Sequence, residues 1–358
     1  MRVAIMTFHR ANNLGAVLQA SALLKYIHDL IGNCEIIDYY PNNDIPTKYK
    51  GIMFILKCFK RIAIFHFTSK DRKKQIKFNE YRLKYYSLSD KQYLGDSGIA
   101  NAHFDYDVII SGSDQILNTT LTGNSKAYYL GFFNGKKISY ASSFGRKDVS
   151  KEEIELIRNE LPEFTALSVR EQSGADIIKR EIGRAPQLVL DPVFLLGKEE
   201  WSKRCNEELN LPNKYIFVYS MEVSPILENA VSTMKKELGL PVIVVRGGGK
   251  PGLIEGKEDS ACGPEEFLRY IRDAELVITN SFHGTAFSLI FEKKFICVAH
   301  STRNARLENI LHLINQGEKM ISYSLEEYNN KVIYGDKSIS NLERYIDLSK
   351  NYLIENIV

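Results

Sequence analysis

Short apolar runs rich in β-branched residues recur along this chain, and helical patterns separate them. This alternation limits the possible folds most, because continuous apolar strands that alternate with helices form parallel sheets covered on both faces. The runs fall into two series, which predicts an α/β protein with two doubly wound domains. The first series comprises residues 3–6, 35–39, 107–111, 138–142, 168–170 and 188–190, and the second comprises 215–220, 241–245, 276–279 and 295–298.

The chain length of 358 residues suits two domains of ordinary size. We place the boundary near residues 191–201, where Asp-Pro ends a strand and Gly197 interrupts the pattern. The predicted domains are therefore 1–192 and 193–330, followed by a helical segment at 331–358.

Composition argues against several classes of protein. The formal net charge of +3 is too close to balance for a general nucleic-acid binder. No run reaches the roughly 18 apolar residues of a membrane span, and the first residues lack the features of a secretory signal. The five cysteines form no C-x-x-C pair, which argues against a zinc site or a disulfide framework. No H-x-x-x-H pattern or clustered carboxylates suggest another metal. We therefore expect a cytoplasmic protein without a metal.

In open α/β sheets, ligands bind beyond the carboxyl ends of the strands. The loop after residues 3–6 carries His9, Arg10, Asn13 and Gly15 and leads into an apolar helix pattern. Basic groups beside free helix N–H groups suit an anion, and Gly15 permits a close approach. A structural interpretation is also open, in which an asparagine caps the helix and Gly15 only turns the chain.

The buried strand at 107–111 leads into Gly-Ser-Asp-Gln, and Asn118 follows shortly after. Small residues such as Ser113 allow a ligand to approach closely. Asp114 and Gln115 can hold hydroxyl groups or take a proton from them. The alternative is that Ser113 or Asp114 caps the next helix.

Two further loops carry groups that can act on an anion. Arg170 ends a strand that otherwise reads as buried, and it can grip a carboxylate or phosphate or pair with an internal acid such as Glu171. The most specific loop is TNSFHGT, in which His283 lies at a predicted helix N-terminus and Gly284 gives room. A histidine in that place can bind an anion or move a proton near neutral pH.

Taken together and in order, these loops resemble those of the polysaccharide pyruvyltransferase family. The resemblance runs from about residue 1 to about residue 310. The matching stretches are TFHRANNLGAVLQA, DVIISGSDQILN, YYLGFF, ISYASSFG, LSVREQSGADI, VLDPVFLL and ITNSFHGTAFSLI.

The resemblance implies two Rossmann-like domains arranged as in GT-B glycosyltransferases, with the site in the cleft between them. It also implies that the segment 331–358 returns to the first domain. The implied reaction moves the carboxyvinyl unit of phosphoenolpyruvate, as a co-substrate, onto a sugar of a cell-surface polysaccharide or its lipid-linked precursor. A pyruvate ketal forms and phosphate leaves.

The same resemblance implies roles for single residues. His283 matches a histidine that serves donor binding and proton transfer, and Arg170 matches an arginine that looks like a donor clamp. To these we add Asp114 as the base that assists the attacking hydroxyl group. We further predict that Arg10, Arg246, Ser281, Gly284 and Gly15 bind the donor or its phosphate, and that Ser113, Gln115, Asn118 and Asn13 bind the acceptor.

One departure from the family concerns charge. Several members carry an arginine two residues before the histidine, where this chain has Ser281. The positive charge must then come from elsewhere, such as Arg246, Arg303 or Arg306, or the donor differs. A glycosyltransferase that uses a nucleotide sugar and a non-catalytic protein that binds a polysaccharide precursor therefore remain alternatives.

Residues 50–77 are basic and apolar, and many of the apolar side chains share one helical face. A basic amphipathic helix can lie on an anionic membrane surface, which suits a lipid-linked acceptor at the inner face of the membrane. The alternative is a helix that packs on its own domain with a solvated basic face.

Overall fold

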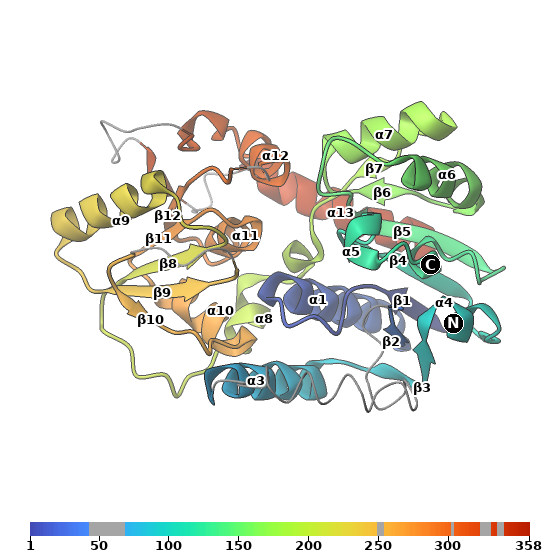
Figure 1. Ribbon diagram of the computed structural model, residues 1–358, viewed down its shortest axis with the longest axis horizontal. Coiled ribbons are helices and arrows are strands. Elements are labelled where there is room, and N and C mark those ends of the chain that lie inside the picture. Colours follow the sequence, from blue (N-terminus) through green and yellow to red (C-terminus); the bar gives the residue numbers. More distant parts are fainter. Residues whose placement is uncertain (43–68, 249–253, 302–303, 323–330, 335–339) are drawn as a thin grey trace, which may run out of the picture.

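The computed structural model describes residues 1–42, 69–248, 254–301, 304–322, 331–334 and 340–358. The chain forms two sheets of predominantly parallel strands, and helices cover both of them (Figure 1). The predicted fold class is therefore confirmed.

The first sheet has the strand order β3-β2-β1-β4-β5-β6-β7, and all of its pairs are parallel. Its strands are β1 (Val3–Met6), β2 (Cys34–Tyr40), β3 (Leu88–Leu94), β4 (Val108–Asp114), β5 (Lys136–Ser142), β6 (Ser168–Val169) and β7 (Gln187–Leu188).

The second sheet has the order β10-β9-β8-β11-β12-β13, in which only the β12–β13 pair is antiparallel. Its strands are β8 (Ile216–Ser220), β9 (Val242–Arg246), β10 (Lys257–Glu258), β11 (Leu276–Thr279), β12 (Lys294–Cys297) and β13 (Ile333–Tyr334).

Helices connect the strands and cover the sheets. The α-helices are α1 (Leu14–Ile31), α3 (Ser69–Tyr85), α4 (Gly95–Ala100), α5 (Thr119–Thr122), α6 (Lys151–Glu160), α7 (Gln172–Ile182), α8 (Lys198–Ser202), α9 (Pro225–Leu238), α10 (Pro264–Asp273), α11 (Phe282–Ile290), α12 (Ala305–Leu313) and α13 (Ser340–Ile357). The short 3₁₀ turns are η2 (Ala127–Tyr129), η3 (Leu161–Glu163), η4 (Pro192–Leu195) and η5 (Gly317–Lys319).

Every predicted strand is present, together with three further strands that are either polar or only two residues long. β3 reads LSDKQYL and lies at the edge of the first sheet, while β10 and β13 have two residues each and form the edges of the second. An edge strand has a neighbour on one side only, so it needs less apolar surface than a central strand. The run-based prediction finds central strands for this reason.

Alternate residues of each strand enter opposite faces of a sheet. In β1, Val3 and Ile5 belong to one apolar cluster, whereas Ala4 and Met6 belong to another. The period of two is that of a strand, and both faces are buried because helices cover each side. The continuous apolar runs of the sequence thus have a direct structural cause.

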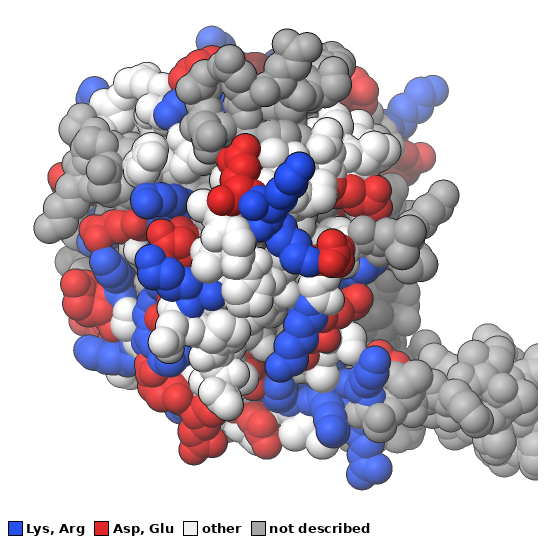
Figure 2. Space-filling view, turned by 90° about the vertical axis from the view of Figure 1, so that its left-hand side faces the viewer, with Lys and Arg blue, Asp and Glu red and all other residues white. Residues whose placement is uncertain are grey.

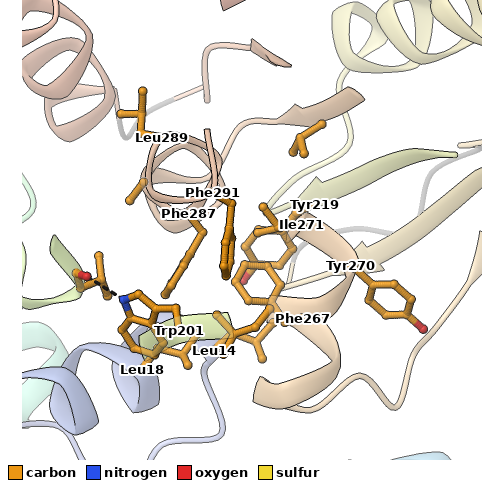
Figure 3. Packing of buried hydrophobic residues seen from close by; sticks show 14 of the residues in the cluster. Leu14, Leu18, Trp201, Tyr219, Phe267, Tyr270, Ile271, Phe287, Leu289 and Phe291 are labelled. Atoms are coloured by element: carbon orange, nitrogen blue, oxygen red, sulfur yellow. Dashed lines mark hydrogen bonds between the residues drawn. The ribbon is translucent and has the colours of Figure 1, made fainter. Parts of the chain in front are cut away.

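A third cluster joins the two halves of the molecule. Leu14 and Leu18 of α1 pack in the same core as Phe267 of α10 and Phe287 of α11 (Figure 3). Trp201 is fully buried there, and its indole N–H donates to the carbonyl oxygen of Val193 at 2.9 Å. Helix α1 therefore belongs to the first half by connectivity and to the shared core by packing.

Helix α13 also crosses between the halves (Figure 1). Leu342 lies in the shared core, while Tyr352 and Leu353 belong to the apolar cluster on the face of the first sheet that contains Val3 and Ile5. The Tyr352 hydroxyl donates to the carbonyl of Ser139 at 2.8 Å, and the Ser349 hydroxyl accepts from the amide of Leu190 at 2.8 Å. The proposed division at residues 192 and 193 falls on η4, between the two sheets, and stays a prediction.

Part of the basic segment 50–77 lies outside the described residues, and its last residues, 69–77, begin α3. No described helix combines the length and the apolar character that crossing a bilayer requires.

We expect Phe287→Ala to lower the free energy of unfolding by about 3–5 kcal/mol, because it opens a cavity beside Trp201 in the shared core. Urea unfolding followed by Trp201 fluorescence and by far-ultraviolet circular dichroism should still give coincident transitions, since the halves share this core. Leu83→Ala is the control, because Leu83 is 85% exposed and its loss should change stability by less than about 0.5 kcal/mol. Separate transitions for the two probes in wild-type protein would contradict the shared core.

Candidate active site

The candidate site begins at the carboxyl edge of the first sheet, where a buried arginine meets three carboxylates. Asp114 ends β4, Arg170 and Glu171 follow β6, and Asp191 lies after β7. The Arg170 guanidinium donates to Asp114 Oδ1 at 2.9 Å and to Asp191 Oδ2 at 2.5 Å. Its Nε lies 3.8 Å from Glu171 Oε2. We call these four residues the Arg170 cluster.

The Arg170 cluster fixes the loops that surround it. Glu171 Oε1 accepts hydrogen bonds from the Ser143 hydroxyl at 2.7 Å and from the Phe144 amide at 3.1 Å, so it orders the loop after β5. The Arg170 side chain is only 2% exposed. A buried guanidinium with several carboxylate partners has its charge largely balanced by the protein.

The second half of the molecule brings His283 to this cluster. Ser281 caps α11, so the next two residues, Phe282 and His283, lie in the first turn of that helix. His283 Nε2 lies 3.8 Å from Asp191 Oδ2, is buried, and makes no hydrogen bond within the described chain. On its other side, the ring packs against α1 at Gly15, where a Cβ atom would lie 2.1 Å from Nδ1. Gly15 is thus required for the position of the imidazole.

The protonation states follow from burial and charge. Burial and the neighbouring Arg170 charge lower the pKa of His283 to about 4, so the imidazole is neutral at pH 7. The pKa of Asp114 is lowered, although burial opposes this, because the positive charges of Arg170 and Arg306 favour the carboxylate. Asp114 also has a φ of 79°, a conformation that is uncommon for non-glycine residues.

Arg306 of α12 supplies a second guanidinium. Burial and the charge of Arg170 lower its pKa to about 10, so it stays positive at neutral pH. Its guanidinium carbon lies 5.7 Å from the centre of the Phe282 ring, and no carboxylate of the described residues forms an ion pair with it. Arg306 is therefore available to an anion in a way that Arg170 is not.

Two cavities meet at this site. The larger cavity, of about 310 Å³, lies in the first half and is lined by Thr7, Phe8, His9, Arg10, Ala11, Asn13, Ala16, Tyr39, Pro41, Asp114, Gln115, Leu121 and Tyr128. The smaller cavity, of about 100 Å³, lies between the halves and is lined by Asn13, Asp114, Gln115, Tyr219, Met221, Asn280, Ser281, Phe282, His283, His300 and Arg306. Asn13, Asp114 and Gln115 line both, so they form the common wall.

The structure brings together many of the predicted site residues. His283 and Ser281 line the smaller cavity, while Asp114, Gln115 and Asn13 stand between the two. Asn13 also caps α1 by accepting from the amide of Ala16, as the structural interpretation of this loop predicts. The smaller cavity holds no more than a compact ligand, and within the described residues no group of His, Cys, Asp and Glu is arranged to bind a metal.

Arg10 lines the larger cavity and not the smaller one, which contains His283. Its guanidinium pairs with Asp38 and stacks on Tyr40 at 3.6 Å from the ring centre. His9 Nε2 lies 3.2 Å from the same carboxylate, and burial lowers the pKa of His9. One buried carboxylate therefore explains why two basic residues follow the first strand.

Six predicted residues line neither cavity: Gly15 and Arg170, described above, and Ser113, Asn118, Gly284 and Arg246. The Ser113 hydroxyl donates to the carbonyl of Ala141, and the Asn118 amide group donates to the carbonyl of Phe144. Gly284 packs on Thr279, where a Cβ atom would lie 2.3 Å from Oγ1. Arg246 Nε lies 3.3 Å from Glu258 Oε2. The side-chain hydrogen bonds of Ser113 and Asn118 serve the fold.

Sequence reasoning gave no role to Asp191 and no site to Phe282. Asp191 lies in the stretch VLDPVFLL and Phe282 in the stretch ITNSFHGT, and nothing in the sequence indicates that these two stretches are close in space. Arg306 was one of three candidates for the missing charge, and the structure places it in the smaller cavity. Arg303 lies outside the described residues.

A family model described as polysaccharide pyruvyl transferase matches residues 13–302, which is most of the chain and includes Asp114, Arg170, Asp191 and His283. The chain belongs to the polysaccharide pyruvyl transferase family. Membership in this family implies an enzyme that transfers a pyruvyl group to a polysaccharide. A comparison with curated proteins gives no match.

Solved structures resemble this family member in fold. Anabaena HepE, solved with UDP and glucose, has a TM-score of 0.57 at 9% identity. The match covers 100% of this chain and 99% of the HepE chain. A Listeria monocytogenes protein provisionally assigned as a UDP-N-acetylglucosamine 2-epimerase has a TM-score of 0.53 at 10% identity, covering 99% of this chain and 89% of its own. At such identities the likeness establishes the GT-B-like arrangement alone.

The pKa of His283 predicts a pH dependence of stability. An unfolded histidine takes up a proton below about pH 6.5, whereas folded His283 resists protonation until about pH 4, so acid favours the unfolded chain across this window. Between pH 7 and pH 5 this histidine should lower the free energy of unfolding by about 2 kcal/mol. Urea unfolding at both pH values should show this loss in wild-type protein and a smaller loss in His283→Gln. Equal losses would mean that folded His283 titrates normally.

Proposed function

We propose that this family member transfers the carboxyvinyl group of phosphoenolpyruvate to a sugar and closes a pyruvate ketal. One observation carries the proposal: Asp114 stands in the wall between two cavities, and the smaller of them also contains His283 and Arg306. A transferase that joins a small anionic donor to a polyol acceptor needs such a pair of adjoining sites.

The smaller cavity is the proposed donor site. Its volume of about 100 Å³ suits a compact molecule such as phosphoenolpyruvate, since drug-sized ligands need about 300 Å³ or more. Arg306 offers a guanidinium to the carboxylate or phosphate, which replaces the arginine that several family members carry at the position of Ser281. The size of this cavity argues against a nucleotide sugar.

The larger cavity is the proposed acceptor site. Its volume of about 310 Å³ accommodates a sugar unit, and it combines the apolar faces of Phe8, Tyr39 and Tyr128 with polar groups on the common wall. Aromatic faces with a few placed polar groups are typical of small-molecule sites. A hydroxyl group of the sugar would then reach Asp114 and Gln115.

The proposed reaction uses groups on both sides of the wall. His283 protonates the methylene carbon of phosphoenolpyruvate, which makes C2 electrophilic and oxocarbenium-like. A sugar hydroxyl adds to C2 and gives its proton to Asp114. The C2–O bond to phosphate then breaks, phosphate leaves with the electron pair, and a second hydroxyl adds to C2 and gives its proton to His283, which is neutral again after the first step. Asp114 is a weak base because of Arg170, but a strongly electrophilic carbon requires no stronger one.

Charge balance indicates how the donor is accommodated. Among the described residues, the site contains the carboxylates of Asp114, Glu171 and Asp191 and the two guanidinium groups of Arg170 and Arg306, while His283 is neutral. An arriving anion favours the charged form of a nearby histidine. We therefore propose that donor binding raises the pKa of His283 and loads it with the proton it later transfers.

Isothermal titration calorimetry with phosphoenolpyruvate tests this proposal. At pH 7, in buffers of different ionisation enthalpy, we expect binding with uptake of close to one proton, and no uptake in His283→Gln. Arg306→Ala should weaken binding by about 10- to 100-fold, because it removes a charge-assisted contact. Arg10→Ala should leave donor affinity within about twofold, since Arg10 lies in the other cavity.

The outcomes separate the candidates. Loss of donor binding in Arg10→Ala but not in Arg306→Ala would move the donor to the larger cavity. Binding of a nucleotide sugar without binding of phosphoenolpyruvate would favour the glycosyltransferase and overturn the pyruvyl donor. Asp114→Asn should retain donor binding and lose phosphate release in the presence of acceptor.

We also propose that the acceptor is lipid-linked and that α3 contacts an anionic membrane, on the side where phosphoenolpyruvate is available. Helix α3 has seven basic against two acidic residues. Arg72 and Lys73 are exposed on one helical face with Ile76 and Leu83, which are 46% and 85% exposed. In Figure 2, Lys and Arg side chains gather at the lower right, at the height of α3 in Figure 1.

This helix adjoins the proposed acceptor site. Arg82 donates to the carbonyl oxygens of His9, Arg10 and Ala11, and Gln75 accepts from the side chain of Asn12 at 2.8 Å. These residues belong to the loop at the larger cavity. A membrane against α3 would therefore present a lipid-linked sugar close to its site.

Sedimentation with vesicles tests the membrane contact. We expect binding to vesicles of phosphatidylglycerol and phosphatidylcholine but not to phosphatidylcholine alone. Arg72→Glu with Lys73→Glu should weaken it at least about tenfold, because each basic residue near an anionic surface contributes about 1 kcal/mol. The matched control is Lys151→Glu with Lys236→Glu, which makes the same charge change on α6 and α9. Equal binding by both double variants would exclude α3 as the contact.

A further inference from the structure

Asp191 has no role in the reaction described above, yet it is the carboxylate nearest the imidazole of His283. We infer that Asp191 is a positioning residue that keeps the proton of neutral His283 on Nε2, so that Nδ1 is the nitrogen that faces the ligand. The inference rests on the proposed function for the role of His283, but the geometry stands without it.

The Asp191 carboxylate is held from two directions. Its Oδ1 accepts from the amide of Val193 at 3.2 Å and thereby caps η4, and its Oδ2 accepts from Arg170 at 2.5 Å. The residue is 1% exposed. A carboxylate fixed in this way cannot turn away from a neighbour, so its field at His283 Nε2 is permanent.

The two edges of the His283 ring face different surroundings. Nε2 is buried, has no hydrogen-bond partner among the described residues, and lies 3.8 Å from Asp191 Oδ2. Nδ1 and Cε1 face Gly15 in the first turn of α1, beside Asn13, which reaches the smaller cavity. Only the Nε2 edge has a carboxylate beside it.

These surroundings favour one tautomer. With the proton on Nε2, the N–H dipole points toward the Asp191 carboxylate. With the proton on Nδ1, the Nε2 lone pair would face that carboxylate, which is repulsive in a buried site. The 3.8 Å separation can shorten to a hydrogen bond in the substrate complex, since catalytic contacts are often long before substrate binds.

The consequence concerns proton transfer. When donor binding raises the pKa of His283 and the ring takes up a second proton from solution, that proton enters at Nδ1, on the ring edge that faces Gly15, and it is this proton that reaches the substrate. Asp191 stabilises the imidazolium that exists in between. Other folds use a buried aspartate in the same way to orient a catalytic histidine.

The test compares Asp191→Asn with wild type. Asparagine keeps the size of the side chain and is also a good helix cap, so the contact with Val193 can persist. In ¹⁵N-histidine NMR, with His283 assigned by its loss in His283→Gln, wild type should give the Nε2–H tautomer pattern, and Asp191→Asn should shift it toward Nδ1–H. Phosphate release should fall about 10²- to 10⁴-fold. We expect the KM for phosphoenolpyruvate to stay within a few-fold.

Glu171→Gln is the matched control. It also removes a carboxylate from the Arg170 cluster, but no contact joins Glu171 to His283, so the tautomer should not change. An Nδ1–H pattern in wild type, or an unchanged pattern in Asp191→Asn, would overturn the inference. The tautomer measurement needs no substrate, so it remains decisive if phosphoenolpyruvate is not the donor.

Discussion

The rest of the site depends on the burial of Arg170 among three carboxylates. Its side chain reaches Asp114 and Asp191, which follow two different strands, and its backbone carbonyl accepts from Asn309 of α12 at 3.1 Å. One residue thus ties three loops of the first half to a helix of the second. Removing one partner of a buried ion pair costs about 3–5 kcal/mol, so these loops hold a fixed arrangement before any ligand binds.

This cluster also determines which groups remain for chemistry. Because carboxylates balance the charge of Arg170, our proposal assigns anion binding to Arg306 and proton transfer to His283, which burial keeps neutral. Both adjoining cavities border this cluster, because Asp114 lines each of them. From the sequence resemblance, Arg170 was expected to bind the donor. The sequence does not show that carboxylates of the protein already pair with its side chain.

Much of the central fold could be predicted from the sequence. The apolar runs located the central strands, and the loops that follow them include His283, Asp114, Gln115 and Asn13, all of which line a cavity. The edge strand β3 could not be found in this way, because its sequence is polar. Ser113 and Asn118 have the same chemistry as cavity residues, but their side-chain hydrogen bonds go to backbone carbonyls of the first half.

The sequence by itself determined the alternation of strands and helices, the family and the loops that carry polar groups, because these properties depend on local periodicity and motif order. Only the tertiary structure decided which of those groups meet. Asp191 and His283 are far apart in the chain and come within 3.8 Å of each other because α1, α10 and α11 share one core. Contacts between distant segments depend on how the two halves pack, and no local pattern encodes that packing.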